Sequence, residues 1–406
     1  MQKKLILIFI FVFIDVLGFS LILPLLPYYA ETFDATPTVV GLLLGANAAS
    51  QLIGAPIIGR LSDRYGRRPM LILSIAGTFV SFLILGLANS LWMLFASRIL
   101  DGFLGGNISL AQAYITDVTD KENRARGLGI IGASFGLGFI FGPALGGALS
   151  AGASYSRPAL AAAVLSALNL LGVLLWLPES LPPNKRAEIT KRPKPAFTAR
   201  ALREALNRPC VGPLLHVGLF YGLAFTTFQT IFSLFAQKRL GLGAQSTSYI
   251  FTYVGLLIVA VQGGGVGLLT KRFSEKQLIF GASIVLSLSL LAWALTPTLW
   301  LLLIVLAPIA LAGGTLNISI NSALTKSVYP EEMGGTLGLS ASLSSFDRVV
   351  SPIVGAFLLD NVGTAAPGIL GALLMGWLIS FTWRRVLFVP DLDCPAPAEI
   401  AEISGD

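Results

Sequence analysis

Apolar residues fill most of the chain in about twelve long runs that are separated by short polar segments. Each run is roughly 18 to 25 residues long, which matches the ~30 Å hydrocarbon core of a lipid bilayer. In lipid, backbone N–H and C=O groups must be satisfied within the segment, so runs of this length are predicted to be helices. We expect transmembrane helices near 5–29, 39–59, 70–89, 92–115, 127–150, 158–177, 209–235, 246–269, 277–296, 299–324, 335–359 and 367–389.

The longest polar interruption divides these spans into two groups of six. The two halves align at an offset of 208 residues, which places Leu91-Trp92 on Leu299-Trp300 and Gly105-Gly106 on Gly313-Gly314. Pseudo-symmetric halves of this kind are typical of transporters, whose substrate site lies between the halves near the bilayer midplane. The pattern predicts an all-α membrane protein with four parts: an N-terminal six-helix bundle at 1–177, a cytoplasmic linker at 178–208, a C-terminal six-helix bundle at 209–389 and a disordered tail at 390–406.

Positive charge is distributed very unevenly between the two sides of the predicted membrane. If the N-terminus is cytoplasmic, 23 of the 28 Lys and Arg residues lie on the cytoplasmic side, and only Arg157, Lys238 and Arg239 lie outside. The positive-inside rule then places both termini in the cytoplasm of a cell membrane, which we expect to be a bacterial plasma or inner membrane. The basic pI of about 9.5 is therefore a topology signal, and no nucleic-acid partner is predicted.

The sequence contains none of the motifs that an enzyme or a metalloprotein would need. No metal-ligand cluster, phosphate-binding loop or nucleophile triad is present, so we predict no catalytic residues, no metal and no cofactor. The two cysteines, Cys210 and Cys394, both fall on the cytoplasmic side, where disulfides are rare.

Three glycine-rich motifs carry a family resemblance. They are Gly59-x-Leu61-x-Asp63-Arg64-x-Gly66-Arg67-Arg68 after the second span, Arg98-x-x-Asp101-Gly102-x-x-Gly105-Gly106 in the fourth, and Gly132-x3-Gly136-x-Gly138-x3-Gly142-Pro143-x2-Gly146-Gly147 in the fifth. In this order and in these helices, they resemble the major facilitator superfamily, and within it the twelve-helix drug:proton antiporters typified by tetracycline exporters. The resemblance covers residues 1–390. It implies the major facilitator fold, transport of a small molecule by a monomer, and a proton gradient as the driving force.

The first motif combines tight-turn glycines with one acid among several bases. Gly59 is expected to permit close helix approach and Gly66 a tight turn. The resemblance implies a conformational latch of the outward-facing state, whereas the alternative is a loop that only fixes topology. Its switchable ion pairs are expected to involve Asp63, Arg64, Arg67, Arg68 and Asp117, the last at the end of the fourth span.

In the fifth span, small residues repeat every fourth position. Gly138, Gly142 and Gly146 therefore share one helix face, and Pro143 adds a bend. We expect this helix-5 motif to form a pliable contact between the two halves.

Apart from Arg384 and Arg385 at the cytoplasmic end of the last span, five charged residues lie within predicted spans, where a charge costs about 2.5–3.5 kcal/mol on insertion scales and usually faces a cavity. Asp15 lies near the middle of the first span, and Arg98 and Asp101 share a face of the fourth. Asp347 and Arg348 are adjacent in the eleventh and so point about 100° apart. We predict that these five residues couple proton movement to transport; the alternative for Arg98 and Asp101 is a static ion pair. Ser81 stands where tetracycline exporters that resemble this chain carry a carboxylate.

Polar and aromatic residues in several spans are candidates for substrate binding. An aromatic seam on the seventh span either lines a cavity for flat, apolar or cationic compounds or faces lipid, and the sequence leaves both open. The seam continues to Phe232 and Phe235. The candidates are Gln112, Tyr221, Phe225, Phe228, Gln229, Asn317 and Asn321.

The leading hypothesis is a proton-coupled exporter of small amphiphilic or drug-like compounds. A proton-linked transporter of a metabolite or a lipid-type substrate is the first alternative. A membrane scaffold or receptor is the second, and the charged residues within the spans argue against it because a scaffold has no use for them.

Overall fold

The computed structural model describes residues 2–152, 154–182, 184, 186, 199–209, 211–329 and 332–387. Throughout these residues the only regular secondary structure is helical. Ten of the described helices are long and apolar enough to cross a membrane, and Ala244–Ala260 is a shorter apolar helix. The all-α membrane fold class is thereby confirmed. The predicted tail at 390–406, residues 183, 185 and 187–198 of the linker, and both cysteines lie outside the described residues.

The described residues of the first half of the chain form eight helices. In chain order they are α1 (Gln2–Ile22), α2 (Leu26–Glu31), α3 (Pro37–Tyr65), α4 (Arg67–Gly86), α5 (Leu91–Leu104), α6 (Asn107–Val118), α7 (Lys121–Leu149) and α8 (Ser156–Trp176).

The second half begins with the short α10 and includes two π-helical turns. Its elements are α10 (Ala199–Asn207), α11 (Gly212–Leu240), α12 (Ala244–Ala260), η1 (Val261–Gly265), α13 (Val266–Thr270), α14 (Glu275–Leu295), α15 (Leu299–Lys326), α16 (Met333–Asn361), α17 (Ala366–Thr382) and η2 (Trp383–Leu387).

The helices form two compact units. Unit 1 comprises Met1–Pro193, Thr230–Leu256 and Pro352–Thr364, and unit 2 comprises Lys194–Gln229, Leu257–Ser351 and Ala365–Asp406. Unit 1 thus includes the first-half helices together with the C-terminal parts of α11 and α16 and most of α12. The units are defined by packing, and unit 1 includes segments from both halves of the chain. The division into two six-helix bundles, one from each half, therefore stays a prediction.

The fourth predicted span, 92–115, is interrupted in the structure. It forms two helices, α5 and α6, because the helical hydrogen bonding stops at Gly105 and Gly106. Just before the break, α5 lies so close to α3 that a Cβ at Gly102 would overlap the Asn47 carbonyl, and a Cβ at Gly54 would overlap the Phe103 carbonyl. Small residues permit this backbone-to-backbone packing.

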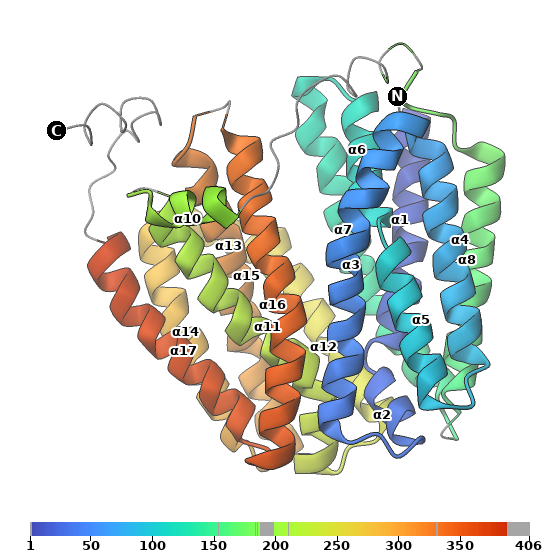
Figure 1. Ribbon diagram of the computed structural model, residues 1–406. Coiled ribbons are helices and arrows are strands. Elements are labelled where there is room, and N and C mark those ends of the chain that lie inside the picture. The colour runs from blue at the N-terminus through green and yellow to red at the C-terminus, as the bar shows by residue number, and fades with distance from the viewer. Residues whose placement is uncertain are drawn as a thin grey trace. The chain divides into compact units, whose positions relative to one another are not determined.

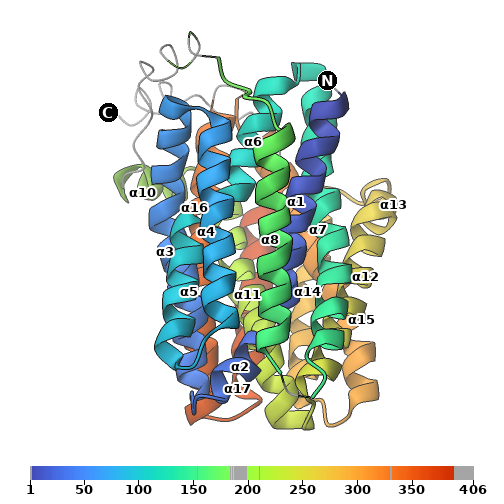
Figure 2. The same ribbon diagram turned by 90° about the vertical axis from the view of Figure 1, so that its right-hand side faces the viewer.

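In unit 1, α7 packs along α1, and Figure 2 shows these helices side by side with α8. A Cβ at Gly138 would lie 2.6 Å from Val16 Cγ1, and the Ser20 hydroxyl donates to the Gly138 carbonyl at 2.8 Å. Gly142 and Gly146 likewise contact the α1 backbone. The expectation that this glycine face contacts the other half is therefore wrong, since α1 belongs to the same half.

The contact between α7 and the second half of the chain involves a neighbouring glycine. A Cβ at Gly147 would lie 2.9 Å from Ser248 Cβ in α12, and Gly255 of α12 approaches the Phe139 carbonyl. In unit 2, α14 packs against α15 and α17, as Figure 1 shows. The N-terminus of α14 is closed by a capping box between Ser274 and Gln277.

Candidate functional site

Unit 2 encloses a cavity of about 320 Å³, lined chiefly by α11, α15 and α16. This volume lies in the range of sites that hold small molecules. Seven residues predicted from the sequence line it: Tyr221, Phe225, Gln229, Asn317, Asn321, Asp347 and Arg348. We call this space the unit 2 cavity.

Two aromatic rings form one wall of the unit 2 cavity. The ring centroids of Tyr221 and Phe225 lie 5.5 Å apart with an interplanar angle of 22°. The Tyr221 hydroxyl donates to the Gly313 carbonyl at 2.8 Å, which fixes the ring against α15. A Cβ at Gly313 would overlap the Phe225 ring, so the glycine leaves the space that the ring needs.

The remaining aromatic residues of the α11 seam do not line this cavity. Phe228 is buried and packs edge-on against Trp293, with ring centroids 5.0 Å apart. Phe232 and Phe235 are buried within unit 1, where Phe232 packs against Phe251. The seam is thus divided: its first two rings face the cavity, and the other three pack within the protein and do not face lipid.

Asp347 and Arg348 bring two opposite charges to the unit 2 cavity. Asp347 is 1% exposed, and its Oδ1 has no hydrogen-bond partner among the described residues. Its carboxylate lies against Gly222, where a Cβ would overlap Oδ2. Arg348 is exposed and also lines the cavity. Within the described part of the chain, no ion pair joins the two side chains.

In unit 1, Asp15 belongs to a small hydrogen-bonded group. Asn107 Nδ2 donates to Asp15 Oδ1 at 2.6 Å and to Thr78 Oγ1 at 3.2 Å. A space of about 10 Å³ borders both Asp15 and Asn107. This is about the room that one water molecule needs. Asp15 is therefore not sealed into dry packing.

Arg98 and Asp101 form a second buried group in unit 1. Arg98 Nη1 lies 3.5 Å from Asp101 Oδ2, while Arg98 Nη2 donates to the hydroxyls of Ser81 at 3.2 Å and Ser97 at 3.1 Å. Asn47 Nδ2 also donates to Asp101 Oδ2, at 3.2 Å. Ser81 is thus a neutral partner of Arg98 at the position where a carboxylate was expected from the family resemblance.

Gln112 lies away from both groups. The break between α5 and α6 separates it from Arg98 and Asp101, and its side chain is exposed whereas theirs are buried. The unit 2 cavity does not include it. The structure therefore does not bring Gln112 together with the other substrate candidates.

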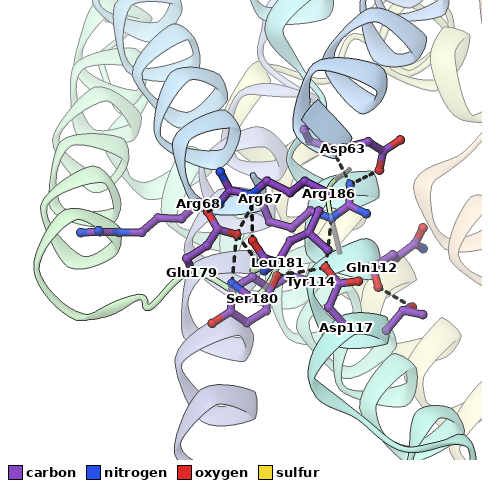
Figure 3. Close-up of polar contacts among 12 residues, drawn as sticks. Asp63, Arg67, Arg68, Gln112, Tyr114, Asp117, Glu179, Ser180, Leu181 and Arg186 are labelled. Atoms are coloured by element: carbon purple, nitrogen blue, oxygen red, sulfur yellow. Dashed lines mark hydrogen bonds and ion pairs between the residues drawn. The ribbon is translucent and has the colours of Figure 1, made fainter. Parts of the chain in front are cut away.

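A third polar cluster joins the end of α3 to α4, α6 and the segment after α8, as Figure 3 shows. Arg67 lies at its centre and is 7% exposed. Its Nη1 contacts Asp63 Oδ1 at 2.7 Å, and its Nε contacts Asp117 Oδ2 at 3.0 Å. Ser180 Oγ also donates to Asp117, at 3.0 Å. We call this the Arg67 cluster.

Sequence reasoning missed the acid that completes the Arg67 cluster. Glu179 accepts hydrogen bonds from the backbone N–H groups of Arg67 at 2.9 Å and Arg68 at 3.2 Å, and so it binds the N-terminus of α4 (Figure 3). Its Oε2 also lies 3.5 Å from Arg186 Nη2. The sequence did offer one signal for Glu179, because it is an acid at the end of a predicted span, as Asp117 is.

Among the other residues of the first motif, one prediction is confirmed and the rest differ from the structure. Gly66 adopts φ +108°, which confirms the predicted turn. A Cβ at Gly59 would meet nothing within 4 Å, so the predicted close approach there is wrong. Arg64 lies over the Tyr65 ring, and the Arg68 guanidinium donates to the Leu174 carbonyl at 2.6 Å.

At the α2 end of unit 1, first-half residues bind second-half residues. Thr38 Oγ1 donates to Asp360 Oδ2 at 2.7 Å, and the Tyr28 hydroxyl lies 2.6 Å from Thr247 Oγ1. Gln237 Nε2 donates to Glu31. We call these three pairs the closing contacts. They tie α2 and α3 to α11, α12 and α16.

Comparisons with known proteins agree with this architecture. The profile of the Major Facilitator Superfamily matches residues 8–352. The chain is 32% identical to an Escherichia coli protein, tetracycline resistance protein, class C, over 84% of this chain and 86% of that one. It is 29% identical to solute carrier family 22 member 18 of Mus musculus, over 89% and 91% of the two chains. The crystal structure of the human organic anion transporter TETRAN superposes with a TM-score of 0.70 at 23% identity, over 94% of this chain and 99% of that chain.

Proposed function

Because the chain belongs to the Major Facilitator Superfamily and is a multi-pass membrane transporter of small molecules, we propose that it exports amphiphilic or drug-like compounds in exchange for protons. Relatives named as tetracycline resistance proteins, which match most of the chain, support export. A mammalian solute carrier matches at nearly the same identity, so the names of relatives do not define the compound. The transporter family argues against the scaffold or receptor alternative.

The observation that carries this proposal is the carboxylate of Asp347 in the unit 2 cavity. A buried carboxylate without a partner is strongly disfavoured in its charged form. The charge of the adjacent Arg348 acts on it without forming an ion pair, and full stabilisation comes from a proton or from a cationic group of a bound compound. Because both cannot occupy one carboxylate fully, binding of the compound releases the proton, and the reverse step releases the compound. This competition is the chemical basis of exchange.

Unit 1 supplies further groups for proton coupling. Asp15 borders a space about the size of one water molecule, and a water there would be its immediate proton donor or acceptor. Asp101 is paired with Arg98 at 3.5 Å, and this contact weakens if the carboxyl is protonated. We assign Asp15 as a second proton site, and Arg98 and Asp101 as the pair that responds to it.

The proton gradient supplies enough energy for this exchange. One charge that moves through 100 mV releases about 2.3 kcal/mol, which sustains roughly a fifty-fold concentration gradient of the compound. No cofactor is needed. The chain is proposed to act as a monomer in the bacterial plasma or inner membrane, with both termini in the cytoplasm.

In this orientation the Arg67 cluster lies at the cytoplasmic face and the closing contacts lie at the outer face. Alternating access requires the closing contacts to break before the compound can leave. The ion pairs of Arg67 with Asp63 and Asp117 are present together with the closing contacts, so we propose that they hold α3, α4 and α6 together at the cytoplasmic face. A latch of the outward-facing state would need further contacts that form only when the closing contacts break.

Reconstitution into proteoliposomes tests the proposal. An inside-acid gradient should drive accumulation of a transported compound in the lumen against its own gradient, and a proton ionophore should abolish the accumulation. Accumulation that ignores the ionophore would remove proton coupling. A screen that finds transport only of lipids or metabolites would favour the alternative substrate class instead.

A further inference from the structure

We infer that the unit 2 cavity selects aromatic zwitterions, with Asp347 holding the cationic group and Arg348 the anionic group. The inference rests on the proposed function, because it names the substrate class of the same cavity. It goes beyond that proposal, since an exporter of simple cations or neutral compounds would not need Arg348.

The first step is that the cavity offers two separate charges. Asp347 and Arg348 both line it, and no ion pair joins them within the described residues. Adjacent positions on a helix point about 100° apart, so the two side chains diverge from α16. A ligand that satisfies both must therefore carry its charges at opposite ends of its body and not on a single carbon.

The second step concerns the acidic end. Asp347 is almost fully buried, and its Oδ1 lacks a hydrogen-bond donor. Its Oδ2 packs directly against Gly222, where a Cβ would overlap it. An ammonium group would supply both the missing donor and the compensating charge. A neutral compound would leave the carboxylate without either.

The third step concerns the basic end. A guanidinium presents a planar fork of donors that suits a carboxylate in bidentate geometry. Arg348 is exposed to the cavity, and no carboxylate of the described residues pairs with it. A compound with only a positive charge would meet this guanidinium as a like charge. A compound with only a negative charge would meet Asp347 in the same way.

The fourth step concerns the body of the ligand. The rings of Tyr221 and Phe225 provide a flat apolar wall, and the side chains of Gln229, Asn317 and Asn321 add neutral polar groups. A cavity of about 320 Å³ has room for a compact aromatic ring system. An aromatic body that bears a cation at one end and an anion at the other satisfies every group on the walls.

Three related ligands test the inference with the wild-type protein alone. We would titrate the purified full-length protein at pH 7 with a fluoroquinolone that carries a piperazinium and a carboxylate. Its methyl ester keeps only the cation, and its N-acetyl derivative keeps only the anion. We expect the zwitterion to bind at least ten-fold more tightly than either derivative. Equal affinity of the three, or no binding of the zwitterion, would overturn the inference.

Two isosteric variants assign the charges. Asp347→Asn should weaken the zwitterion and the ester about ten-fold or more but should not weaken the N-acetyl derivative, because a charge-assisted contact is lost only at the cationic end and a like charge is removed from the anionic compound. Arg348→Gln should show the reverse pattern. Parallel losses for all three ligands in either variant would mean that the residues are merely structural, and would contradict the assignment.

The binding assay needs no proton gradient, so its failure can be told from failure of the proposed function. Selective binding of the zwitterion together with transport that ignores protons would refute only the exchange mechanism. Proton-driven transport in which the ester binds and moves as well as the zwitterion would refute only the substrate class.

Discussion

Neutralising Glu179 should loosen the N-terminus of α4. The first N–H groups of a helix have no partners within it, and here the Glu179 carboxylate accepts from Arg67 N at 2.9 Å and Arg68 N at 3.2 Å. In Glu179→Gln, charge-assisted hydrogen bonds become neutral ones, the favourable interaction with the helix dipole disappears, and the amide nitrogen faces a donor. Each charge-assisted bond contributes about 1.5–3 kcal/mol, against about 0.5–1.5 kcal/mol for a neutral one. The helix dipole adds about 0.3–1 kcal/mol.

These terms together predict a loss of about 2 kcal/mol in the free energy of local opening at the first turn of α4. Because 1.4 kcal/mol corresponds to a factor of ten, the amides of Arg67 and Arg68 should exchange hydrogen roughly thirty-fold faster. Hydrogen–deuterium exchange with mass spectrometry on peptides that cover the start of α4 measures this rate.

Ser180→Ala is the matched control for this experiment. It removes the hydrogen bond from Ser180 Oγ to Asp117 but keeps the carboxylate of Glu179, so α4 should exchange much less fast than in Glu179→Gln. If Glu179→Gln exchanged at the wild-type rate, the Glu179 carboxylate would not stabilise the start of α4. Glu179 would then have no stabilising role in the Arg67 cluster.

Three further changes test other parts of the structure. Gly222→Ala places a methyl group on the Asp347 carboxylate and should weaken substrate binding about ten-fold, whereas Gly281→Ala in α14, which does not line the unit 2 cavity and whose Cβ would meet nothing within 4 Å, should bind like the wild type; equal affinities would contradict the position of Asp347. Asp15→Asn should uncouple transport from protons and preserve the helical fold by circular dichroism, and full coupling in this variant would make Asp15 structural. Joining Thr38→Cys to Asp360→Cys with a short thiol cross-linker, in a protein without Cys210 and Cys394, should stop transport until the linker is reduced; unimpaired transport would show that this closing contact need not open.

Much of the architecture was predictable because lipid imposes helices of a given length on an apolar sequence. The interruption of the fourth span was not, since the apolar run continues through Gly105 and Gly106, and the side chains that bind the freed backbone groups there, Gln51 and Ser74, lie on other helices. The glycine face of α7 was recognised, but its partner was not. A small-residue pattern predicts close packing without saying which helix approaches.

In the candidate site, too, some residues were predictable from the sequence and others were not. Polar and aromatic residues within apolar spans identified seven of the sixteen residues that line the unit 2 cavity, because polar residues are costly in lipid and usually face a cavity. Phe228 was misplaced, since one helix carries aromatic residues toward both a cavity and a packed core. Glu179 was missed because it meets Arg67 across 112 positions of sequence, and no periodicity within a helix reports such a contact.

The central claim is that binding of the compound and release of a proton are one exchange at Asp347. It is tested most directly by recording lumenal pH with a trapped dye while a transported compound is added outside proteoliposomes that have the same pH on both sides. The lumen should become alkaline as the compound enters and protons leave, and Asp347→Asn should abolish this change. Entry of the radiolabelled compound through the wild-type protein with no change in lumenal pH would contradict the account.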